Sequence, residues 1–393
     1  MPSKRKKNAK AAKKKRTAPR RARRGPTRSK RKPATPVAPV DDYWSPVTEP
    51  PAPVAGNRSS VAEGSEPSPR HGPRVTGHPK WPPAILLMGP TASGKTALAL
   101  RLAAELPCEI ISVDSAQIYQ GMDIGTAKPA ADILRAAPHH LLDIIEPHES
   151  YSAARFRDDA LALMREITER NRIPLLVGGT MLYFRALVEG LSDLPEADPI
   201  VRLMIDTMAE QEGWPAVHEK LRQVDPETAA RLDPHDSQRI ERALEVYYLT
   251  DKPLSQLLRK PKYVYFPYTP IKIALIPSQR EVLHERIAQR FDAMIEQGLV
   301  AELKKLREDY GLEPGMPSMR CVGYRQAWDF LEGRLDVAGL REQGIAATRQ
   351  LAKRQLTWLR SMQDATEFDC LAADLETYVL EYVRRELEAV LVR

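Results

Sequence analysis

The sequence is poor in cysteine and contains no long apolar run. Its 393 residues include only Cys108, Cys321 and Cys370, which are far apart and form no CxxC pair. Neither a disulfide framework nor a zinc site is indicated, and a reducing compartment is expected. No segment approaches the roughly 20 apolar residues that a membrane helix needs, and the N-terminus lacks the apolar core of a signal peptide. We therefore expect a soluble, cytoplasmic protein with no membrane partner.

Acidic residues are absent from the first 40 positions, which hold 17 of the 59 Lys and Arg residues. The rest of the chain has 42 basic residues against 52 acidic ones, so the formal charge of +7 hides an acidic body. Residues 41–80 contain 8 Pro and 4 Gly, a composition that cannot offset its ordering entropy by burial. We predict a disordered basic and Pro-rich tail over residues 1–80. The tail either binds nucleic acid, or only solubilises the chain, or results from a wrongly assigned start.

Strand and helix patterns alternate after the tail. Apolar strands are predicted at 84–88, 109–113, 173–177 and 271–276, and helices at 96–106, 153–170, 280–310, 341–362 and 371–393. Between 198 and about 260 the strands disappear, and helical patterns are separated by Asp-Pro turns. The alternation predicts an α/β fold with a parallel sheet, interrupted by a helical insertion. The predicted domains are a tail at 1–80, the first part of the core at 81–196, the insertion at 197–266, and core completion with a C-terminal helical extension at 267–393.

A phosphate-binding loop follows the first predicted strand and opens the first helix. Its sequence is Gly89-Pro90-Thr91-Ala92-Ser93-Gly94-Lys95-Thr96. In this motif backbone N–H groups face phosphates, the lysine contacts phosphate oxygens, and the last hydroxyl, here Thr96, binds a magnesium ion. The loop indicates a polyphosphate ligand, but it does not decide whether phosphorus or carbon is attacked.

Asp114 directly follows the second predicted strand. Because the carboxyl ends of neighbouring parallel strands meet at one crevice, we expect Asp114 to face the phosphate loop. A helix N-cap is the alternative role for this residue, and it is compatible with a catalytic one.

Beyond the phosphate loop, further segments resemble bacterial tRNA dimethylallyltransferases. They are Asp114-Ser-Ala-Gln-Ile-Tyr-Gln-Gly-Met-Asp-Ile-Gly-Thr-Ala-Lys-Pro129, His139-His-Leu-Leu-Asp143, Leu176-Val-Gly-Gly-Thr180-Met-Leu-Tyr183, Ser237-Gln238-Arg239-Ile-Glu-Arg242-Ala-Leu-Glu245, Met319-Arg320-Cys-Val-Gly-Tyr324-Arg325 and Lys353-Arg354-Gln355-Leu-Thr-Trp358-Leu-Arg360. The resemblance covers about residues 82–365. It implies a P-loop kinase-like sheet domain with a helical insertion that helps to hold the tRNA anticodon stem-loop.

The resemblance also implies an activity. The enzyme would transfer the dimethylallyl group of dimethylallyl diphosphate to the 6-amino group of the adenosine 3′ of the anticodon, in tRNAs that read codons starting with U. That amino group is a poor nucleophile, and Asp114 would accept its proton. The Thr91 hydroxyl, with magnesium on Thr96, would stabilise the leaving diphosphate. We expect a monomer.

The resemblance assigns two groups of binding residues. The diphosphate-binding residues are Gly89, Pro90, Thr91, Ala92, Ser93, Gly94, Lys95, Thr96 and Arg290. The tRNA-binding residues are Asp114, Ser115, Ala116, Gln117, Thr180, Arg202, Gln238, Arg239, Ile240, Glu241, Arg242, Arg320, Cys321, Val322, Gly323, Tyr324, Arg325, Lys353, Arg354, Gln355, Trp358 and Arg360. On composition alone, the basic helical residues among them are typical of a solvated surface, and Thr180 is typical of a helix N-cap.

The sequence also counts against several chemistries and leaves rival functions open. No acidic residue follows the strand at 173–177, which counts against ATP hydrolysis, and Asp143 is a candidate magnesium ligand in its place. His139, His140 and His148 are assigned to structure, and nothing activates Cys321 as a nucleophile. The rival functions are a small-molecule kinase, an isopentenyltransferase acting on free adenylates, and a non-catalytic RNA-binding protein. Loss of tRNA dependence would favour the first two, and RNA binding without prenyl transfer the third.

Overall fold

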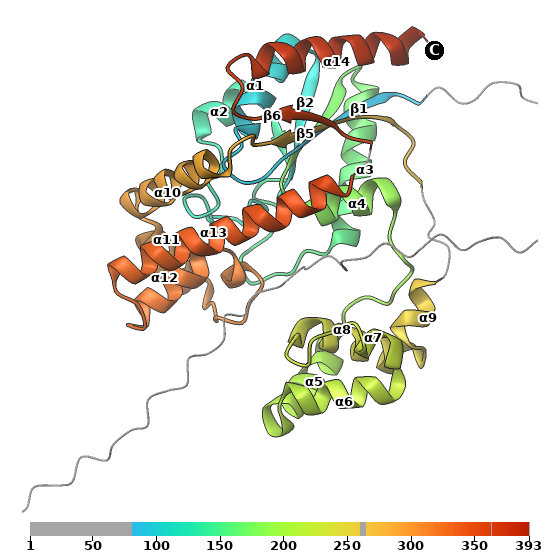
Figure 1. The fold of residues 1–393 in the computed structure, drawn as a ribbon, viewed down its shortest axis with the longest axis vertical. Coiled ribbons are helices and arrows are strands. Elements are labelled where there is room, and N and C mark those ends of the chain that lie inside the picture. Colours follow the sequence, from blue (N-terminus) through green and yellow to red (C-terminus); the bar gives the residue numbers. More distant parts are fainter. Residues whose placement is uncertain (1–80, 260–264, 363, 393) are drawn as a thin grey trace, which may run out of the picture. The chain divides into compact units, whose positions relative to one another are not determined.

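The computed structural model describes residues 81–259, 265–362 and 364–392. The predicted tail at 1–80 lies outside the described residues. Within the described part, a parallel sheet covered by helices forms an α/β core, and five consecutive helices form an insertion (Figure 1). The predicted fold class is therefore confirmed for this part of the chain.

The sheet has six parallel strands in the order β3-β2-β4-β1-β5-β6. Their bounds are Pro83–Met88 for β1, Cys108–Val113 for β2, His139–His140 for β3, Ile173–Gly178 for β4, Thr269–Ile276 for β5 and Thr366–Asp369 for β6. The middle strands are buried almost throughout because helices cover both faces of the sheet. In register, Gly178 of β4 is the partner of both Met88 and Val113, so the loops after β1, β2 and β4 begin side by side.

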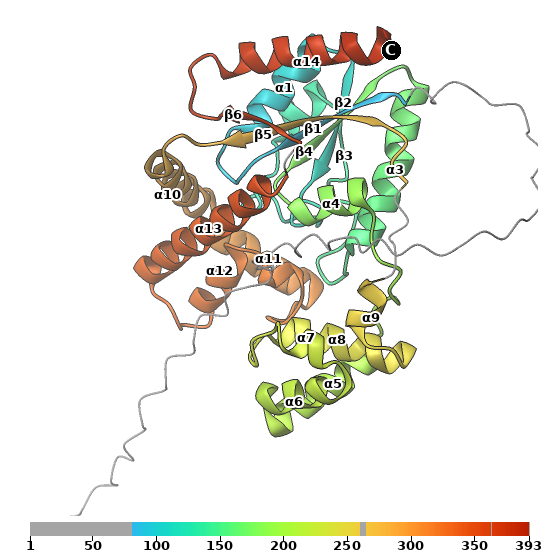
Figure 2. The ribbon, with the colours of Figure 1, turned by 45° about the vertical axis from the view of Figure 1, so that its right-hand side comes forward.

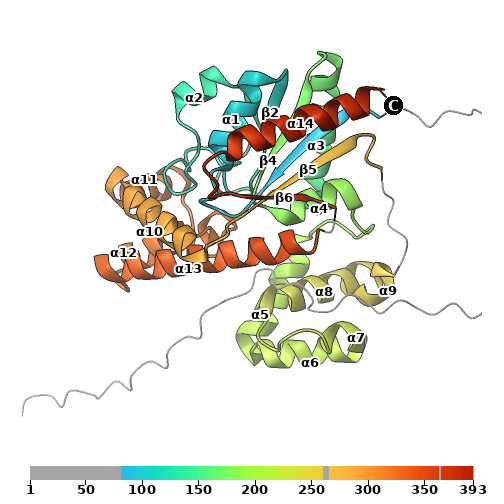
Figure 3. The same cartoon turned by 45° about the horizontal axis from the view of Figure 1, so that its top comes forward.

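Two apolar cores lie on opposite faces of the sheet. On one face, α1 (Lys95–Glu105) and α14 (Leu375–Val392) pack Leu98, Leu102 and Val383 against the strands. On the other face lie α3 (Ala153–Glu169), α4 (Met181–Glu189), α10 (Arg280–Gln297) and α13 (Val337–Arg360). Figures 2 and 3 show α14 and α13 on opposite sides of the sheet. Both faces of the parallel sheet are thereby removed from water.

The insertion has an apolar core of its own. Its helices are α5 (Pro199–Glu212), α6 (Trp214–Val224), α7 (Pro226–Ala229), α8 (Ser237–Thr250) and α9 (Leu254–Leu258). Ile205, Val217, Leu221 and Leu244 are fully buried in this core. Asp198 caps α5 by accepting hydrogen bonds from two of its backbone N–H groups, as the Asp-Pro pattern indicates. The domain boundaries 197–266 stay a prediction.

The remaining elements refine the sequence-based expectations. The helix predicted at 280–310 is divided at Gly298, whose φ of 104° interrupts it, so that α11 (Leu299–Tyr310) follows α10. The strands β3 and β6 were not predicted, nor were the short helices α2 (Ala131–Ala136), α7 and α12 (Tyr324–Leu331). A short 3-10 helix, η1 (Ser318–Arg320), precedes α12.

Candidate active site

The phosphate loop connects β1 to α1 at the carboxyl end of the sheet. Ala92 and Gly94 have φ values of 63° and 86°, which turn the loop tightly around the start of α1. Gly94, the residue before α1, has no side chain to cap the helix, and within the described residues no side chain accepts a hydrogen bond from the first N–H groups of α1, so these groups can bind an anion. Ser93 is buried, and its hydroxyl has no hydrogen-bond partner among the described residues. These features fit a loop that encloses phosphate oxygens.

Lys95 and Arg290 bring two cations to this loop. Lys95 Nζ donates a hydrogen bond of 2.7 Å to the carbonyl oxygen of Pro90. Burial, and then the charge of Arg290, lower the pKa of Lys95 to about 8. The pKa of Arg290, on α10, is also lowered by burial, and within the described residues its guanidinium has no ion pair. Two partly desolvated cations without a matching number of anions indicate a site for a negatively charged ligand.

Asp114 interacts electrostatically with both cations, and its charge raises the pKa of Lys95 and of Arg290 against the effect of burial. Its Oδ1 accepts hydrogen bonds from the backbone N–H groups of Ala116, at 2.8 Å, and Gln117, at 3.4 Å. These bonds form a turn and not a helix cap, because no helix follows β2 here. The second carboxylate oxygen accepts no hydrogen bond within the described part of the chain, so it remains available to accept a proton.

Thr180 connects the loops that follow β2 and β4. It is the first residue before α4, yet its side chain makes no cap hydrogen bond to that helix. Its Oγ1 instead accepts a hydrogen bond of 3.0 Å from the N–H of Ser115. The N-cap alternative thus describes the position of Thr180 but not the role of its hydroxyl.

The segment 320–325 divides into buried and exposed side chains. Burial, with a further contribution from Asp114, raises the pKa of Cys321 to about 12, so the thiol stays protonated and is no nucleophile. Tyr324 is fully buried and donates a hydrogen bond of 2.6 Å to Glu302. Its ring is therefore packed in the core and is no stacking platform for a base in this structure. Arg320 and Arg325 are exposed, and the RNA contact predicted for this segment depends on them.

Glu302 on α11 was not singled out from the sequence. Its carboxylate accepts hydrogen bonds of 2.7–3.1 Å from the backbone N–H groups of Asp123, Ile124 and Gly125, besides that from Tyr324. Glu302 thereby anchors the loop that follows the segment of Asp114. Since 177–179 residues separate the partners, no local pattern could have revealed this contact.

Asp143, the candidate magnesium ligand, is instead an ion-pair partner. Lys128 Nζ lies 2.5 Å from Asp143 Oδ1 and 2.6 Å from Asp123 Oδ1, with its side chain almost fully buried. The described residues include no group of three or more His, Cys, Asp or Glu side chains that could hold a metal. His140 bonds Glu109 at 2.9 Å, in keeping with a structural role. A metal at the phosphate loop would therefore need Thr96, whose side chain is exposed, together with ligand oxygens and water.

In the insertion, the predicted tRNA-binding arginines surround a buried carboxylate. Glu245 is 0% exposed and accepts hydrogen bonds from Arg202, at 2.8 Å, Arg242, at 2.5 Å, and the N–H of Asp198, at 2.9 Å. Burial alone would raise the pKa of Glu245, but the hydrogen bonds from the two arginines and from the N–H of Asp198 together outweigh burial and lower the pKa. Both arginines stay partly exposed, as do Gln238, Arg239 and Glu241, whereas Ile240 is buried. Structural and RNA-contacting roles are therefore compatible for these arginines.

Helix α13 presents different residues to solvent and to the site. Lys353 and Arg360 are exposed, and the Trp358 ring lies under the guanidinium of Arg185. Gln355 points inward instead. Its Oε1 accepts a hydrogen bond of 2.8 Å from the N–H of Thr91, and its Nε2 donates one of 3.0 Å to the carbonyl oxygen of Gly179.

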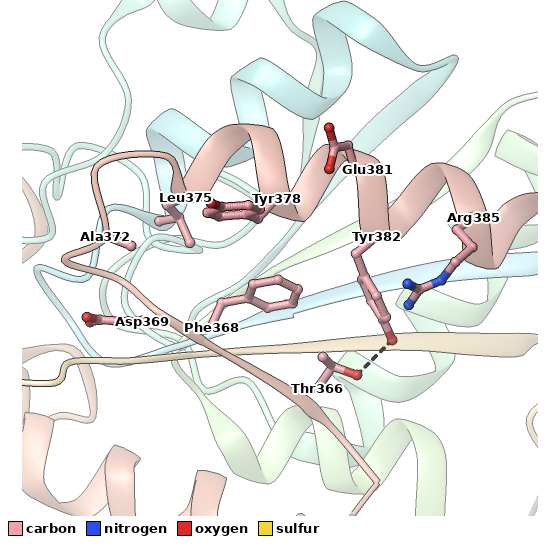
Figure 4. Close-up of a pocket in the computed structure, with 9 residues that line it drawn as sticks. All are labelled: Thr366, Phe368, Asp369, Ala372, Leu375, Tyr378, Glu381, Tyr382 and Arg385. Carbon is pink, nitrogen blue, oxygen red and sulfur yellow. Dashed lines mark hydrogen bonds between the residues drawn. The ribbon is translucent and has the colours of Figure 1, made fainter.

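A cavity of about 550 Å³ lies elsewhere, between β6 and α14 (Figure 4). Phe368, Tyr378 and Tyr382 line it, and the Tyr382 hydroxyl bonds that of Thr366 at 2.9 Å. None of its lining residues belongs to the predicted site. We locate the candidate site at the phosphate loop because the two partly desolvated cations, Lys95 and Arg290, and the carboxylate that interacts with them belong to it.

These elements define an α/β protein whose phosphate-loop motif connects a central strand of the parallel sheet to a helix, with the carboxylate of Asp114 after the second strand. The sequence profile of the IPP transferase family matches residues 117–362. The chain belongs to this family. It is 59% identical to a tRNA dimethylallyltransferase of Nitrosospira multiformis over 79% of this chain and 96% of that one, and 60% identical to that of Thiobacillus denitrificans over 78% and 98%.

Solved structures agree with this assignment. The tRNA isopentenylpyrophosphate transferase of Bacillus halodurans is 37% identical with a TM-score of 0.58, covering 78% of this chain and 97% of that one. A eukaryotic dimethylallyltransferase captured acting on tRNA is 26% identical with a TM-score of 0.64, covering 78% of each chain. In the described part of this chain, no helix is both long and apolar enough to cross a membrane.

Proposed function

We propose that this chain transfers the dimethylallyl group from dimethylallyl diphosphate to the 6-amino group of the adenosine 3′ of the anticodon, in tRNAs that read codons starting with U. The products are N6-isopentenyladenosine and diphosphate. The observation that carries the proposal is the electrostatic interaction of the Asp114 carboxylate with the two partly desolvated cations, Lys95 and Arg290. An acceptor for a proton and a receptor for a diphosphate thus lie together, in a chain of the IPP transferase family.

In the proposed reaction, the amino nitrogen forms a bond to the first carbon of the prenyl group while the bond from that carbon to the diphosphate oxygen breaks. The proton of the amino group passes to the free oxygen of Asp114. Negative charge develops on the leaving diphosphate, where the N–H groups at the start of α1, Lys95 and Arg290 stabilise it. The Thr91 hydroxyl lies in the same loop and would donate to the bridging oxygen.

Magnesium suits this site because the loop provides one exposed hydroxyl, Thr96, and a diphosphate would provide further hard oxygen ligands. When bound there, the ion neutralises part of the diphosphate charge. Lys95 and Arg290 share this task from the protein side.

The tRNA contacts are proposed from exposed or partly exposed side chains. They come from the insertion (Arg202, Gln238, Arg239 and Arg242), from η1 and the first turn of α12 (Arg320 and Arg325), and from α13 (Lys353, Trp358 and Arg360). The target adenine must leave the base stack to reach Asp114, which costs a few kcal/mol and least in a loop. Thr180 and Ser115, joined by their hydrogen bond, would border the extracted base. Because the proposed substrate is tRNA, we expect the protein to act in the cytoplasm. We also expect it to act as a monomer.

The test uses purified protein, magnesium, radiolabelled dimethylallyl diphosphate and unmodified tRNA that reads a codon starting with U. A matched tRNA carries guanosine in place of the adenosine next to the anticodon. Label in the adenosine-bearing tRNA alone is the expected result. Label in neither, from a folded protein, would contradict the proposal, and label in free adenosine nucleotides would favour an adenylate isopentenyltransferase.

A further inference from the structure

Gln355 connects three parts of the chain that are distant in sequence. Its two amide atoms bind the N–H of Thr91, in the phosphate loop, and the carbonyl oxygen of Gly179, in the loop after β4. The first contact joins residues 264 apart and the second joins residues 176 apart. A single side chain of α13 therefore holds the two loops that begin at the carboxyl ends of β1 and β4.

The chain leaves room for this amide at Gly179. A Cβ atom added to Gly179 would clash with Nε2 of Gln355. The nearest backbone atom to this added Cβ, the carbonyl oxygen of Gly89, would lie 3.3 Å away. The absence of a side chain at Gly179 is thus what lets the amide reach both loops.

The hydrogen bond to Gln355 also decides what Thr91 can do. The backbone N–H of Thr91 already donates to Oε1 of Gln355, so this N–H points toward α13. The same hydrogen bond ties the phosphate loop to that helix. Two residues before and five after Gln355, the exposed Lys353 and Arg360 stand on the same helix, on the surface proposed to contact tRNA. Helix α13 therefore contacts the phosphate loop through Gln355 and exposes Lys353 and Arg360 to solvent.

We propose that Gln355 is a positioning residue of the phosphate loop, whose amide fixes Thr91 against Gly179 and links helix α13 to diphosphate binding. This inference rests on the proposed function of the site. It differs from the sequence-based expectation, which assigns Gln355 to direct tRNA contact.

The two roles are distinguished by binding measurements on Gln355→Met, which keeps the length of the side chain but loses both hydrogen bonds. Its affinity for inorganic diphosphate with magnesium, measured by calorimetry, should fall about tenfold, as expected when a partly buried N–H group loses its hydrogen-bond acceptor. Its affinity for tRNA, measured by filter binding, should not change. Thr357→Ala, at an exposed position one helical turn from Lys353, is the matched control and should behave as wild type in both assays.

A double-mutant cycle tests the contact with Gly179. Gly179→Ala alone should weaken diphosphate binding at least as much as Gln355→Ala alone, because the new methyl group displaces the amide. In Gly179→Ala/Gln355→Ala the clashing atoms are gone, so the double variant should bind diphosphate no more weakly than Gly179→Ala alone. Effects that simply multiply would show that the two residues act independently.

The outcomes separate this inference from the proposed function. Diphosphate binding needs no prenyl transfer, so a wild-type protein that fails to transfer label still allows the test of Gln355. Weaker tRNA binding by Gln355→Met with unchanged diphosphate affinity would overturn the inference and favour direct RNA contact. A wild-type protein with no affinity for diphosphate would overturn both. Thermal unfolding of each variant shows whether a loss of binding reflects loss of folded protein.

Discussion

The hydroxyl of Tyr324 donates a hydrogen bond of 2.6 Å to Glu302, whose carboxylate also accepts three backbone N–H groups of residues 123–125. We predict that Glu302→Gln lowers the free energy of unfolding by about 2 kcal/mol. The NH₂ group of the new glutamine cannot accept hydrogen bonds, so some of the backbone N–H groups that Glu302 binds would lose their acceptor. Tyr324→Phe, which removes one donor and keeps the ring, should lower it by about 1 kcal/mol.

Denaturant unfolding followed by circular dichroism measures both effects. Glu308→Gln, on the exposed face of the same helix, is the control and should change stability by less than about 0.5 kcal/mol. If Glu302→Gln were as stable as the control, the carboxylate would not be the anchor of this loop.

The second prediction concerns Asp114. Asp114→Asn preserves an oxygen that can accept the N–H groups of Ala116 and Gln117, so the turn after β2 should persist. The amide cannot accept the proton of the adenosine amino group, and kcat should fall by about 10² to 10⁴. Asp114→Ala should lose as much activity, and both variants should still bind tRNA. Single-turnover transfer of radiolabel, with Asp132→Asn on the exposed part of α2 as control, provides the measurement. Undiminished turnover by Asp114→Asn would exclude the base role.

Local sequence patterns predicted the parts of the fold that depend on neighbouring residues. The strand, glycine-rich loop and helix around Lys95 follow from apolar runs and the phosphate-loop motif within about 20 residues. The strand β6 was missed because Thr366–Asp369 is too short, with one apolar residue, to give a periodic signal. Its pairing with β5 depends on tertiary structure.

For the candidate site, too, the sequence predicts the positions of residues in the chain better than their tertiary contacts. The positions of Asp114 and Thr180 follow from the rule that loops after parallel strands converge. The inward direction of Gln355 and the burial of Tyr324 do not follow, since both depend on partners that are distant in sequence. The resemblance to a family identified the segments but not which side chains of each segment face the core.

The third prediction follows from the pKa of Lys95, which burial and then Arg290 lower to about 8 in the free protein. A bound diphosphate would stabilise the charged amine and raise this pKa, so binding near pH 8.5 should take up a fraction of a proton at Lys95. As the pH rises through 8, the free protein loses the proton and diphosphate affinity should decline. Lys95→Arg stays charged over this range and should show no such uptake.

Calorimetry in buffers of different ionisation enthalpy measures the proton uptake. The titration of diphosphate itself cancels in the difference between wild type and Lys95→Arg. Equal proton uptake by the two proteins would contradict a lowered pKa at Lys95.

The fourth prediction concerns the buried carboxylate of the insertion. Glu245→Ala leaves Arg202 and Arg242 without their buried partner and should destabilise the protein by about 3 to 5 kcal/mol. Glu241→Ala, whose carboxylate lies 3.8 Å from Arg202 and is partly exposed, should have a much smaller effect. Limited proteolysis, with cleavage sites mapped by mass spectrometry, should show earlier cleavage within residues 199–258 for Glu245→Ala. Equal resistance of the two variants would show that Glu245 does not hold the insertion together.

The last prediction concerns residues 1–80, which lie outside the family resemblance. Deleting them removes 21 Lys and Arg residues, 17 of them in the first 40 positions, but no residue of the candidate site, so turnover at saturating substrates should be preserved. If the segment binds RNA electrostatically, the deletion should weaken tRNA binding at low salt and reduce the dependence of affinity on salt concentration. A segment that only solubilises the chain would leave both unchanged. A truncated protein that folds and binds tRNA but has lost turnover at saturation would contradict the assignment of catalysis to the α/β core.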